Sequence, residues 1–347
     1  MSNVFLDACA ARPTPYTPIW LNRQAGRYMP EYHAVKGKLP SLEFFKNPEK
    51  AAQATLDAQR ILGVDAAIMF ADLLPIMEPM GLNLDYKAGE GPVFANPVRS
   101  ARDIEDLRVQ PALEATPYIA QTVKNILSGL PKDIALIGFA GAPFTLASYA
   151  IEGRGSRNYV HVKKMMYEAP GQWHQLLDKL TTQLVSYLQL QIDSGVQAVQ
   201  LFDTWVGALS VADFSEYVLP HLERMITALK STVNAVPVIY FGTGNGHLLE
   251  ATTAAGPDVL AFDWRVPLLQ TWQQLGVKAV QGNLDPIVLC ADRATVVRQA
   301  RAILDEVAGR PGHIFNLGHG IIPETPVDNV KALVDCVHEY SARAAHV

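Results

Sequence analysis

The sequence predicts an α/β fold, a single (β/α)8 barrel domain over residues 1–347 with its active-site cleft at the C-terminal face of the strands. The main observation is that eight short apolar runs, rich in strand-forming residues, alternate with longer segments of helical periodicity. A second observation is that no Gly-rich phosphate-binding loop stands early in the chain, where most doubly wound sheets carry one. Alternation of this kind is typical of a parallel barrel.

The predicted elements follow one another along the whole chain. Apolar residues recur at helical spacing from Leu176 to Ile192 and from Val327 to Val337, so both segments are predicted as helices facing the core. Residues 84–131 and Arg154–Asn158 do not fit the alternation and are interpreted as insertions over the barrel mouth. The runs predicted as strands are Pro18–Leu21, Ala66–Phe70, Ala135–Phe139, Ala198–Phe202, Val238–Phe241, Val259–Phe262, Ala279–Gln281 and His313–Phe315.

Charge and hydropathy exclude several classes of partner. The formal net charge is −5, so nothing global favours nucleic acid or an anionic membrane, and any anion site must be local. The longest nearly apolar stretch, Ile134–Phe144, is shorter than the roughly 18 residues that a membrane-spanning helix needs. Residues Met1–Asp7 resemble neither a secretory signal nor a basic transit peptide, so we expect a cytoplasmic protein.

Cysteine and histidine spacing argues against a metal site. Cys9, Cys290 and Cys336 lie far apart and form no CxxC pair, which speaks against both a disulfide framework and a structural zinc site. None of the nine histidines forms an HxH, HExxH or HxC pattern. We therefore expect no metal.

Polar or Gly-rich residues follow nearly every predicted strand. Because the C-terminal ends of parallel strands meet at one face of a barrel, these residues are predicted to surround one cleft. They are Arg23–Arg27, Asp72, Gly141–Thr145 with Tyr149, Asp203–Trp205, Gly242–Gly246, Asp263–Trp264, Gly282–Asp285 and Asn316–Gly320.

The charged candidates each have a plainer interpretation. Arg23 and Arg27 can converge on neighbouring carboxylates or phosphates, but two solvated surface arginines fit the same spacing equally well. Asp72 follows an apolar run and, taken by itself, is better explained as a helix N-cap before Leu73. On the residues alone both alternatives stay open.

Two loops give weaker signals. Gly242–Gly246 follows a strand, as a phosphate-binding loop would, but its GxGxG spacing matches neither a dinucleotide fingerprint nor a P-loop, so a tight turn is favoured. His319 stands between two glycines and fits a ligand, an acid–base group or an ordinary loop histidine. Neither loop decides the function.

Five ordered segments carry long and specific motifs. Pro18–Tyr32 reads PIWLNRQAGRYMPEY and Gly138–Gly153 reads GFAGAPFTLASYAIEG; three shorter segments are Phe70–Asp72, Leu201–Trp205 and Asn316–Gly320. Together, and over nearly the whole chain, these segments resemble the uroporphyrinogen decarboxylase family.

The resemblance implies a cofactor-free, homodimeric (β/α)8 barrel of haem biosynthesis. Such an enzyme removes CO2 from the four acetate side chains of uroporphyrinogen III and gives coproporphyrinogen III. The residues implied in substrate binding are Arg23, Gln24, Ala25, Gly26, Arg27, Lys36, Asp72, Phe139, Tyr149, Phe202, Thr204 and His319. Those implied in catalysis are Asp72, Arg23, Arg27, Tyr149 and His319.

The implied roles suit the chemistry of an octa-carboxylate tetrapyrrole. Arg23 and Arg27 would bind acetate and propionate groups, and Asp72 would accept hydrogen bonds from the four pyrrole N–H groups. Loss of CO2 requires that a pyrrole α-carbon is first protonated, so that the ring takes up the electron pair. Asp72 would stabilise the resulting cation, and an arginine or a substrate carboxylic acid would supply the proton.

Two positions depart from the family pattern. This chain has Asn22 where the family usually has Met, and Lys36 where it often has Arg. Lysine keeps the positive charge but loses the bidentate fork of arginine, so contact with one substrate carboxylate is expected to differ.

Two other functions were weighed against this one. A corrinoid-dependent methyltransferase of the same superfamily would need an HxC zinc pair near the fifth strand, where this chain reads Tyr240–Gly246 without any Cys. A non-catalytic tetrapyrrole-binding protein would use the same arginines, and the sequence alone does not exclude it.

Overall fold

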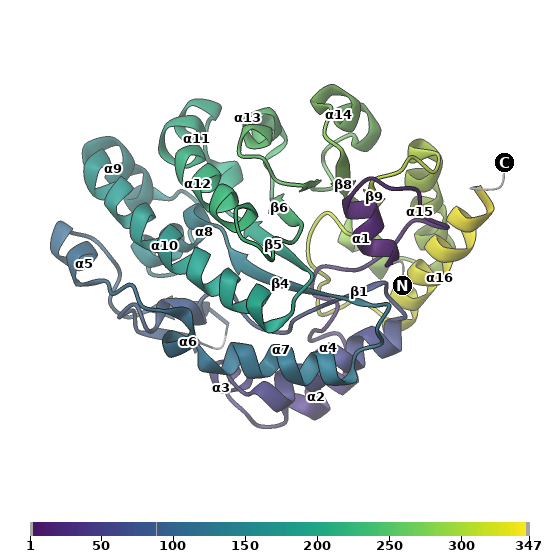
Figure 1. Ribbon diagram of the computed structural model, residues 1–347, viewed down its shortest axis with the longest axis horizontal. Coiled ribbons are helices and arrows are strands. Elements are labelled where there is room, and N and C mark those ends of the chain that lie inside the picture. The colour runs from purple at the N-terminus through teal and green to yellow at the C-terminus, as the bar shows by residue number, and fades with distance from the viewer. Residues whose placement is uncertain (1–2, 88, 345–347) are drawn as a thin grey trace.

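The computed structural model describes residues 3–87 and 89–344, and the ends of the predicted 1–347 domain lie outside that range. Parallel strands form one curved sheet in the order β1-β4-β5-β6-β7-β8-β9 (Figure 1). Their bounds are β1 Ala66–Ile68, β4 Ala135–Gly141, β5 Ala198–Asp203, β6 Val238–Gly242, β7 Val259–Ala261, β8 Ala279–Gln281 and β9 His313–Ile314. The predicted α/β fold with a parallel, barrel-like sheet is confirmed.

The first predicted strand, Pro18–Leu21, joins the two edges of this sheet without being a regular strand. Ile19 forms an isolated parallel bridge with Phe315, just after β9, and its carbonyl accepts a hydrogen bond from the Asp65 amide, just before β1. The prediction of a regular strand here was wrong. Pro18 has no N–H to donate, and the Ile19 amide donates to the Asp65 side chain at 2.7 Å instead of to a ladder carbonyl.

Helices cover the outer face of the sheet (Figure 1). The two helices predicted from periodicity are confirmed as α10 and α16, and the leucine stripe of α10 is buried. Helix bounds are α1 Val4–Cys9, α2 Pro30–Lys36, α3 Ser41–Phe45, α4 Pro48–Leu62, α5 Ala101–Asp106, α6 Ala112–Ala115, α7 Pro117–Gly129, α8 Pro143–Glu152, α9 Val160–Glu168, α10 Pro170–Ser194, α11 Val211–Tyr217, α12 Leu219–Lys230, α13 Leu249–Ala254, α14 Leu268–Leu275, α15 Arg293–Val307 and α16 Val327–Ala344.

The 84–131 segment is not one insertion over the mouth, as the sequence suggested. It begins with an antiparallel hairpin, β2 Leu84–Lys87 and β3 Gly91–Phe94. It ends in α7, which packs against α4 and α10 in the outer layer because its face with Ile119, Val123 and Ile126 is buried. Only the part of the segment before α7 is an insertion into the alternating strand–helix pattern of the barrel.

A chain of buried polar side chains crosses the barrel interior. The Trp20 indole donates to Gln281, the Gln281 amide donates to Gln200, and the Gln200 amide donates to Asn22, at 2.9–3.1 Å. All four side chains are nearly inaccessible to solvent. Asn22, where the sequence departs from the family pattern, is thus part of a hydrogen-bonded core.

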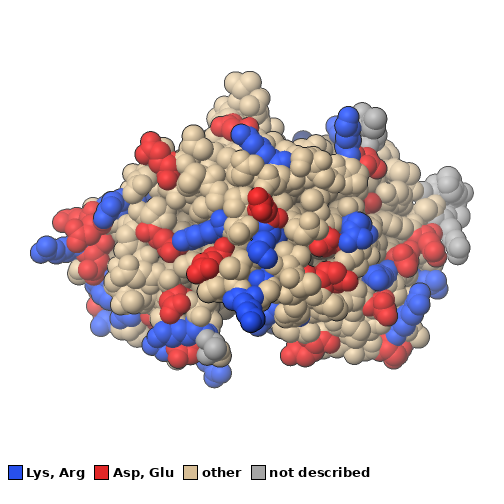
Figure 2. Space-filling model, turned by 90° about the horizontal axis from the view of Figure 1, so that it is seen from below, with Lys and Arg blue, Asp and Glu red and all other residues tan. Residues whose placement is uncertain are grey.

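Surface charge is mixed on the face shown in Figure 2, where lysines and arginines are interspersed with acids. Among the helices of the described residues, none is long and apolar enough to cross a membrane.

Candidate active site

Arg23 lies where the first and last motifs of the chain meet. Its backbone φ is 63°, in the left-handed region, which turns the chain sharply after Leu21. Its side chain packs over Gly320, because a Cβ at that position would lie 2.5 Å from the Arg23 Cδ atom. A glycine next to His319 therefore makes room for this arginine.

Asp72 stands just beyond the C-terminal end of β1. Its Oδ1 atom accepts a hydrogen bond from the Leu74 amide at 3.1 Å and so shapes the turn into a short 3-10 helix, Pro75–Met77. The helix N-cap interpretation was wrong, because no helix begins at Leu73 and the N-cap residue of this 3-10 helix is Leu74. Only one carboxylate oxygen of Asp72 makes the turn contact, so a role in the turn does not exclude a role in the chemistry.

The surroundings of Asp72 affect its ionisation in two directions. Burial raises the pKa of the Asp72 carboxyl, because a charge is poorly solvated there. The Tyr86 hydroxyl, the Leu74 amide and the Arg23 guanidinium act in the opposite direction and favour the charged form. Burial thus disfavours the charge of Asp72, whereas nearby donors and one cation favour it.

Arg23 brings the predicted polar residues together. Burial lowers the pKa of its guanidinium, Asp72 and Tyr149 raise it, and Arg27 lowers it. Burial also lowers the pKa of His319, with Arg23 as the next cause, so this histidine is neutral at pH 7. Burial and Asp72 raise the pKa of Tyr149 to about 12. Arg23, Arg27, Asp72, Tyr149 and His319, predicted from four separate segments of the chain, therefore lie in one group.

Aromatic rings form a wall next to this group. Phe139 and Phe202 from β4 and β5 meet edge to face at 5.6 Å between ring centroids, and Phe202 contacts Phe241 of β6 in the same way at 6.0 Å. Phe241 and Trp264 then lie 6.5 and 6.3 Å from the His319 ring. The strand ends thus place an apolar surface beside the charged residues.

Helix α8 is fastened to the sheet below Tyr149. The fully buried Asp203 accepts hydrogen bonds from Thr145 and from Tyr240, both at 2.8 Å. Burial raises the pKa of Asp203 to about 6. Tyr149, one turn after Thr145, packs edge to face on Trp205 at 5.8 Å.

A family model described as "Uroporphyrinogen decarboxylase (URO-D)" matches residues 2–340, nearly the whole chain. The chain belongs to the uroporphyrinogen decarboxylase family. A uroporphyrinogen decarboxylase of Carboxydothermus hydrogenoformans is 50% identical, covering 99% of this chain and 97% of the relative. One of Sorangium cellulosum is 51% identical, covering 97% of this chain and 96% of the relative.

Solved structures agree on the fold. A methyltransferase from Methanosarcina mazei superposes with a TM-score of 0.80 at 19% identity, covering 97% of both chains. A B12-independent methionine synthase from Shewanella has a TM-score of 0.57 at 11% identity and covers 86% of this chain and 89% of its own. At such identities the likeness concerns architecture, and the family membership rests on the closer relatives.

Two other residues predicted for the uroporphyrinogen decarboxylase site, Gln24 and Lys36, make hydrogen bonds within the chain. The buried Gln24 side chain accepts from the Leu21 amide and donates to the Ala66 carbonyl, so it holds the arginine turn to β1. Lys36, at the end of α2, donates to the Leu39 carbonyl at 2.6 Å. Ala25 and Gly26 lie within the same turn as Gln24, and Thr204 directly follows β5. For none of these does a described contact lead to Asp72.

The Gly242–Gly246 loop behaves as the tight turn that its spacing favoured. Gly244 has φ 65°, and its amide donates to the buried Asp263 carboxylate at 2.6 Å. Arg265 pairs with the same carboxylate and lies 3.7 Å over the Trp264 ring. In the described residues no three His, Cys, Asp or Glu side chains gather as a metal site would require.

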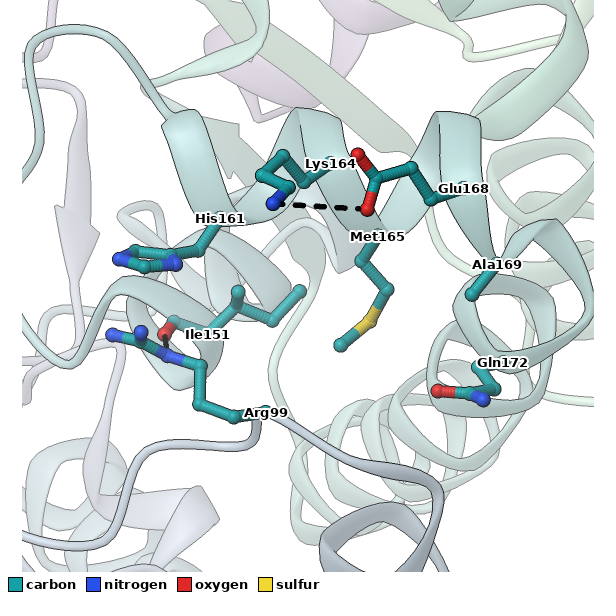
Figure 3. Close-up of a pocket in the computed structure, with 8 residues that line it drawn as sticks. All are labelled: Arg99, Ile151, His161, Lys164, Met165, Glu168, Ala169 and Gln172. Carbon is teal, nitrogen blue, oxygen red and sulfur yellow. Dashed lines mark hydrogen bonds and ion pairs between the residues drawn. The ribbon is translucent and has the colours of Figure 1, made fainter.

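A separate cavity of about 290 Å³ lies between α8, α9 and the start of α10. Figure 3 shows the Arg99 guanidinium against the Ile151 carbonyl and the ion pair between Lys164 and Glu168. Its charged side chains are exposed and none belongs to the group around Arg23. We therefore treat it as distinct from the active site.

Sequence reasoning missed three residues that the structure adds. Phe241 is the register partner of Phe202 in the neighbouring strand. Pairing the two predicted strands in register would therefore have indicated the aromatic wall. Trp264 was noted at a strand end but not given a role. Tyr86 gave no signal, because it comes from the hairpin within the 84–131 segment.

Proposed function

We propose that the protein decarboxylates the four acetate side chains of uroporphyrinogen III to give coproporphyrinogen III, with Asp72 stabilising the cationic intermediate. The observation that carries the proposal is a poorly solvated carboxylate beside an arginine and an aromatic wall at the strand ends. Family membership makes the protein a carboxy-lyase, and these residues explain how it would act.

Substrate binding follows from the charges around the cleft. Arg23 and Arg27 supply guanidiniums for acetate and propionate groups. Phe139 and Phe202 supply an apolar face for the macrocycle. Asp72 has one oxygen committed to the Leu74 amide and faces the pyrrole N–H groups with its remaining acceptor capacity.

The reaction itself uses the ring as its electron acceptor. Protonation of a pyrrole α-carbon creates a cation; the bond between the acetate CH2 and its carboxylate then breaks, CO2 leaves, and the electron pair flows into the ring. A proton added to the exocyclic carbon and one lost from the α-carbon complete the methylpyrrole. Asp72 lowers the energy of the cationic state because its charge is already in place.

The source of the first proton is an arginine or a substrate carboxylic acid. Arginine is a poor acid in water, but burial and Arg27 both lower the pKa of Arg23. Tyr149, with a pKa of about 12, stays protonated and serves as a polar contact. His319, neutral at pH 7, serves as another.

Three further points belong to the proposal and rest on the family resemblance. The enzyme works without a cofactor or metal, because the electron acceptor lies within the substrate. It forms a homodimer, and it acts in the cytoplasm.

The deciding experiment is anaerobic incubation of the purified protein with uroporphyrinogen III, followed by chromatography of the products. We expect stepwise loss of carboxyl groups down to the four-carboxylate product. Binding of the tetrapyrrole without any loss of CO2 would favour the non-catalytic tetrapyrrole-binding alternative. Absence of both binding and turnover would overturn the proposal.

A further inference from the structure

Tyr86 lies in the β2–β3 hairpin but reaches the segment that carries Asp72. Its ring meets Phe45 edge to face at 5.5 Å between ring centroids, and Phe45 in turn contacts Phe70 at 5.6 Å. Phe70 is two residues before Asp72. A ladder of three rings therefore fixes the hairpin against the chain just after β1.

The Tyr86 hydroxyl is a buried polar group in an unusual position. It is inaccessible to solvent and makes no well-formed hydrogen bond within the described residues, although it lies close enough to Asp72 to favour the charged carboxylate. Burial and the nearby Asp72 carboxylate both raise the pKa of Tyr86 well above its ordinary value, so the hydroxyl keeps its proton. A buried donor without an acceptor is costly and is retained where another requirement places it there.

We infer that Tyr86 is a positioning residue for Asp72: its hydroxyl donates a hydrogen bond to the carboxylate in the working enzyme and holds it toward the pyrrole N–H groups. This inference rests on the proposed function. With the Leu74 amide on Oδ1, a second donor would fix the plane of the carboxylate.

The other groups that face Asp72 leave this task to Tyr86. Arg23 is the cation among them, and it is also needed for substrate carboxylates. Tyr32, Tyr149 and Tyr187 sense the Asp72 charge only through space, without a described hydrogen bond to it. The titratable groups that interact with Asp72 in the described residues are Arg23, Tyr32, Tyr86, Tyr149 and Tyr187.

The inference predicts a specific pH effect. A hydrogen bond to the charged carboxylate favours ionisation, so removing it raises the pKa of Asp72 further. If catalysis needs the ionised form, the acidic limb of the kcat profile then moves to higher pH.

The test is Tyr86→Phe, which keeps the ring packed on Phe45 and removes only the hydroxyl. We expect kcat for uroporphyrinogen III to fall about tenfold and the acidic limb to rise by about one pH unit, with little change in KM. The matched control is Tyr16→Phe. The Tyr16 hydroxyl donates to the Asp65 carboxylate at 2.9 Å, at the opposite end of β1. Removing this hydroxyl should leave the dependence of kcat on pH unchanged.

A double-mutant cycle separates this inference from the proposed function. In the Asp72→Asn background, Tyr86→Phe should cause almost no further loss, because the carboxylate it serves is gone. If the wild type is active and Asp72→Asn is impaired, but the kcat–pH profile of Tyr86→Phe equals that of Tyr16→Phe, the role of Tyr86 alone is overturned. A lower kcat in Tyr86→Phe without a shift of the acidic limb also overturns the role of Tyr86, because loss of a merely structural hydroxyl would give the same result. A fully active Asp72→Asn overturns both.

Discussion

Arg23 shows how much one residue can depend on the fold around it. A left-handed backbone costs a residue with a Cβ roughly 1–2 kcal/mol, and the chain accepts this at Arg23. Gly320 leaves room for its side chain, and Gln24 fastens the turn to β1. Such backbone strain, seen directly in the structure, is typical of functional sites.

Removing either guanidinium should therefore affect substrate more than folding. Arg23→Ala and Arg27→Ala are expected to reduce kcat/KM by roughly 10- to 100-fold each, the scale of one charge-assisted contact. Their melting temperatures should stay near that of the wild type. Early melting with normal kinetics would show that these arginines are structural.

At the scale of elements, two buried hydrogen-bonded groups join secondary structures to one another. Asp203 connects β5 to α8 through Thr145 and to β6 through Tyr240. The hydrogen-bonded chain of polar side chains connects Trp20 and Asn22 to Gln281 in β8 and Gln200 in β5. Both sit beneath the site, so they fix the positions from which the polar side chains project.

Asp203 predicts a pH dependence of stability. Its pKa is raised from 3.8 to about 6 in the folded state, so between these values the folded protein binds more protons than the unfolded chain. The contribution of Asp203 to the free energy of unfolding must then fall as pH rises through that window. Urea unfolding at several pH values gives the free energy of unfolding as a function of pH. Between about pH 4 and pH 6 the slope of this free energy against pH should be less negative for Asp203→Asn than for the wild type. Identical slopes would contradict the prediction.

Asn22 predicts a cost for restoring the family's usual residue. Asn22→Met removes the acceptor of the Gln200 amide and leaves a buried donor unpaired, which costs about 1–3 kcal/mol. The free energy of unfolding measures this directly. Asn83→Ala, at an exposed position whose side chain makes no described hydrogen bond, is a control expected to change it little. An unchanged or increased stability in Asn22→Met would mean that the methionine repacks without loss.

At the scale of the whole molecule, the periodicity of apolar residues predicted the secondary structure, because secondary structure depends largely on local sequence. The parallel sheet and helices such as α10 followed from periodicity, and the charged group followed from what stands after each strand. Contacts between distant segments did not follow. Pro18–Leu21 has strand-like residues but keeps only one bridge, to Phe315, because the Ile19 amide donates to the Asp65 side chain. The Tyr86 ring approaches the segment of Asp72 through ring contacts between residues distant in sequence. That residues 1–347 form one domain stays a prediction.

The proposed chemistry also makes a prediction for the whole enzyme. Exhaustive dialysis against a chelator should leave turnover of uroporphyrinogen III intact, because the ring accepts the electron pair itself. A loss of turnover that zinc alone restores would contradict the cofactor-free account and favour a metal-dependent transferase.

The central claim is that the charge of Asp72 stabilises the protonated pyrrole, and Asp72→Asn tests it most directly. Asparagine keeps the shape and still accepts from the Leu74 amide, so an Asp72 that only shapes the turn would tolerate the change. The account predicts a folded protein, checked by its melting temperature, whose turnover of uroporphyrinogen III falls at least about a hundredfold. Turnover near that of the wild type would contradict it.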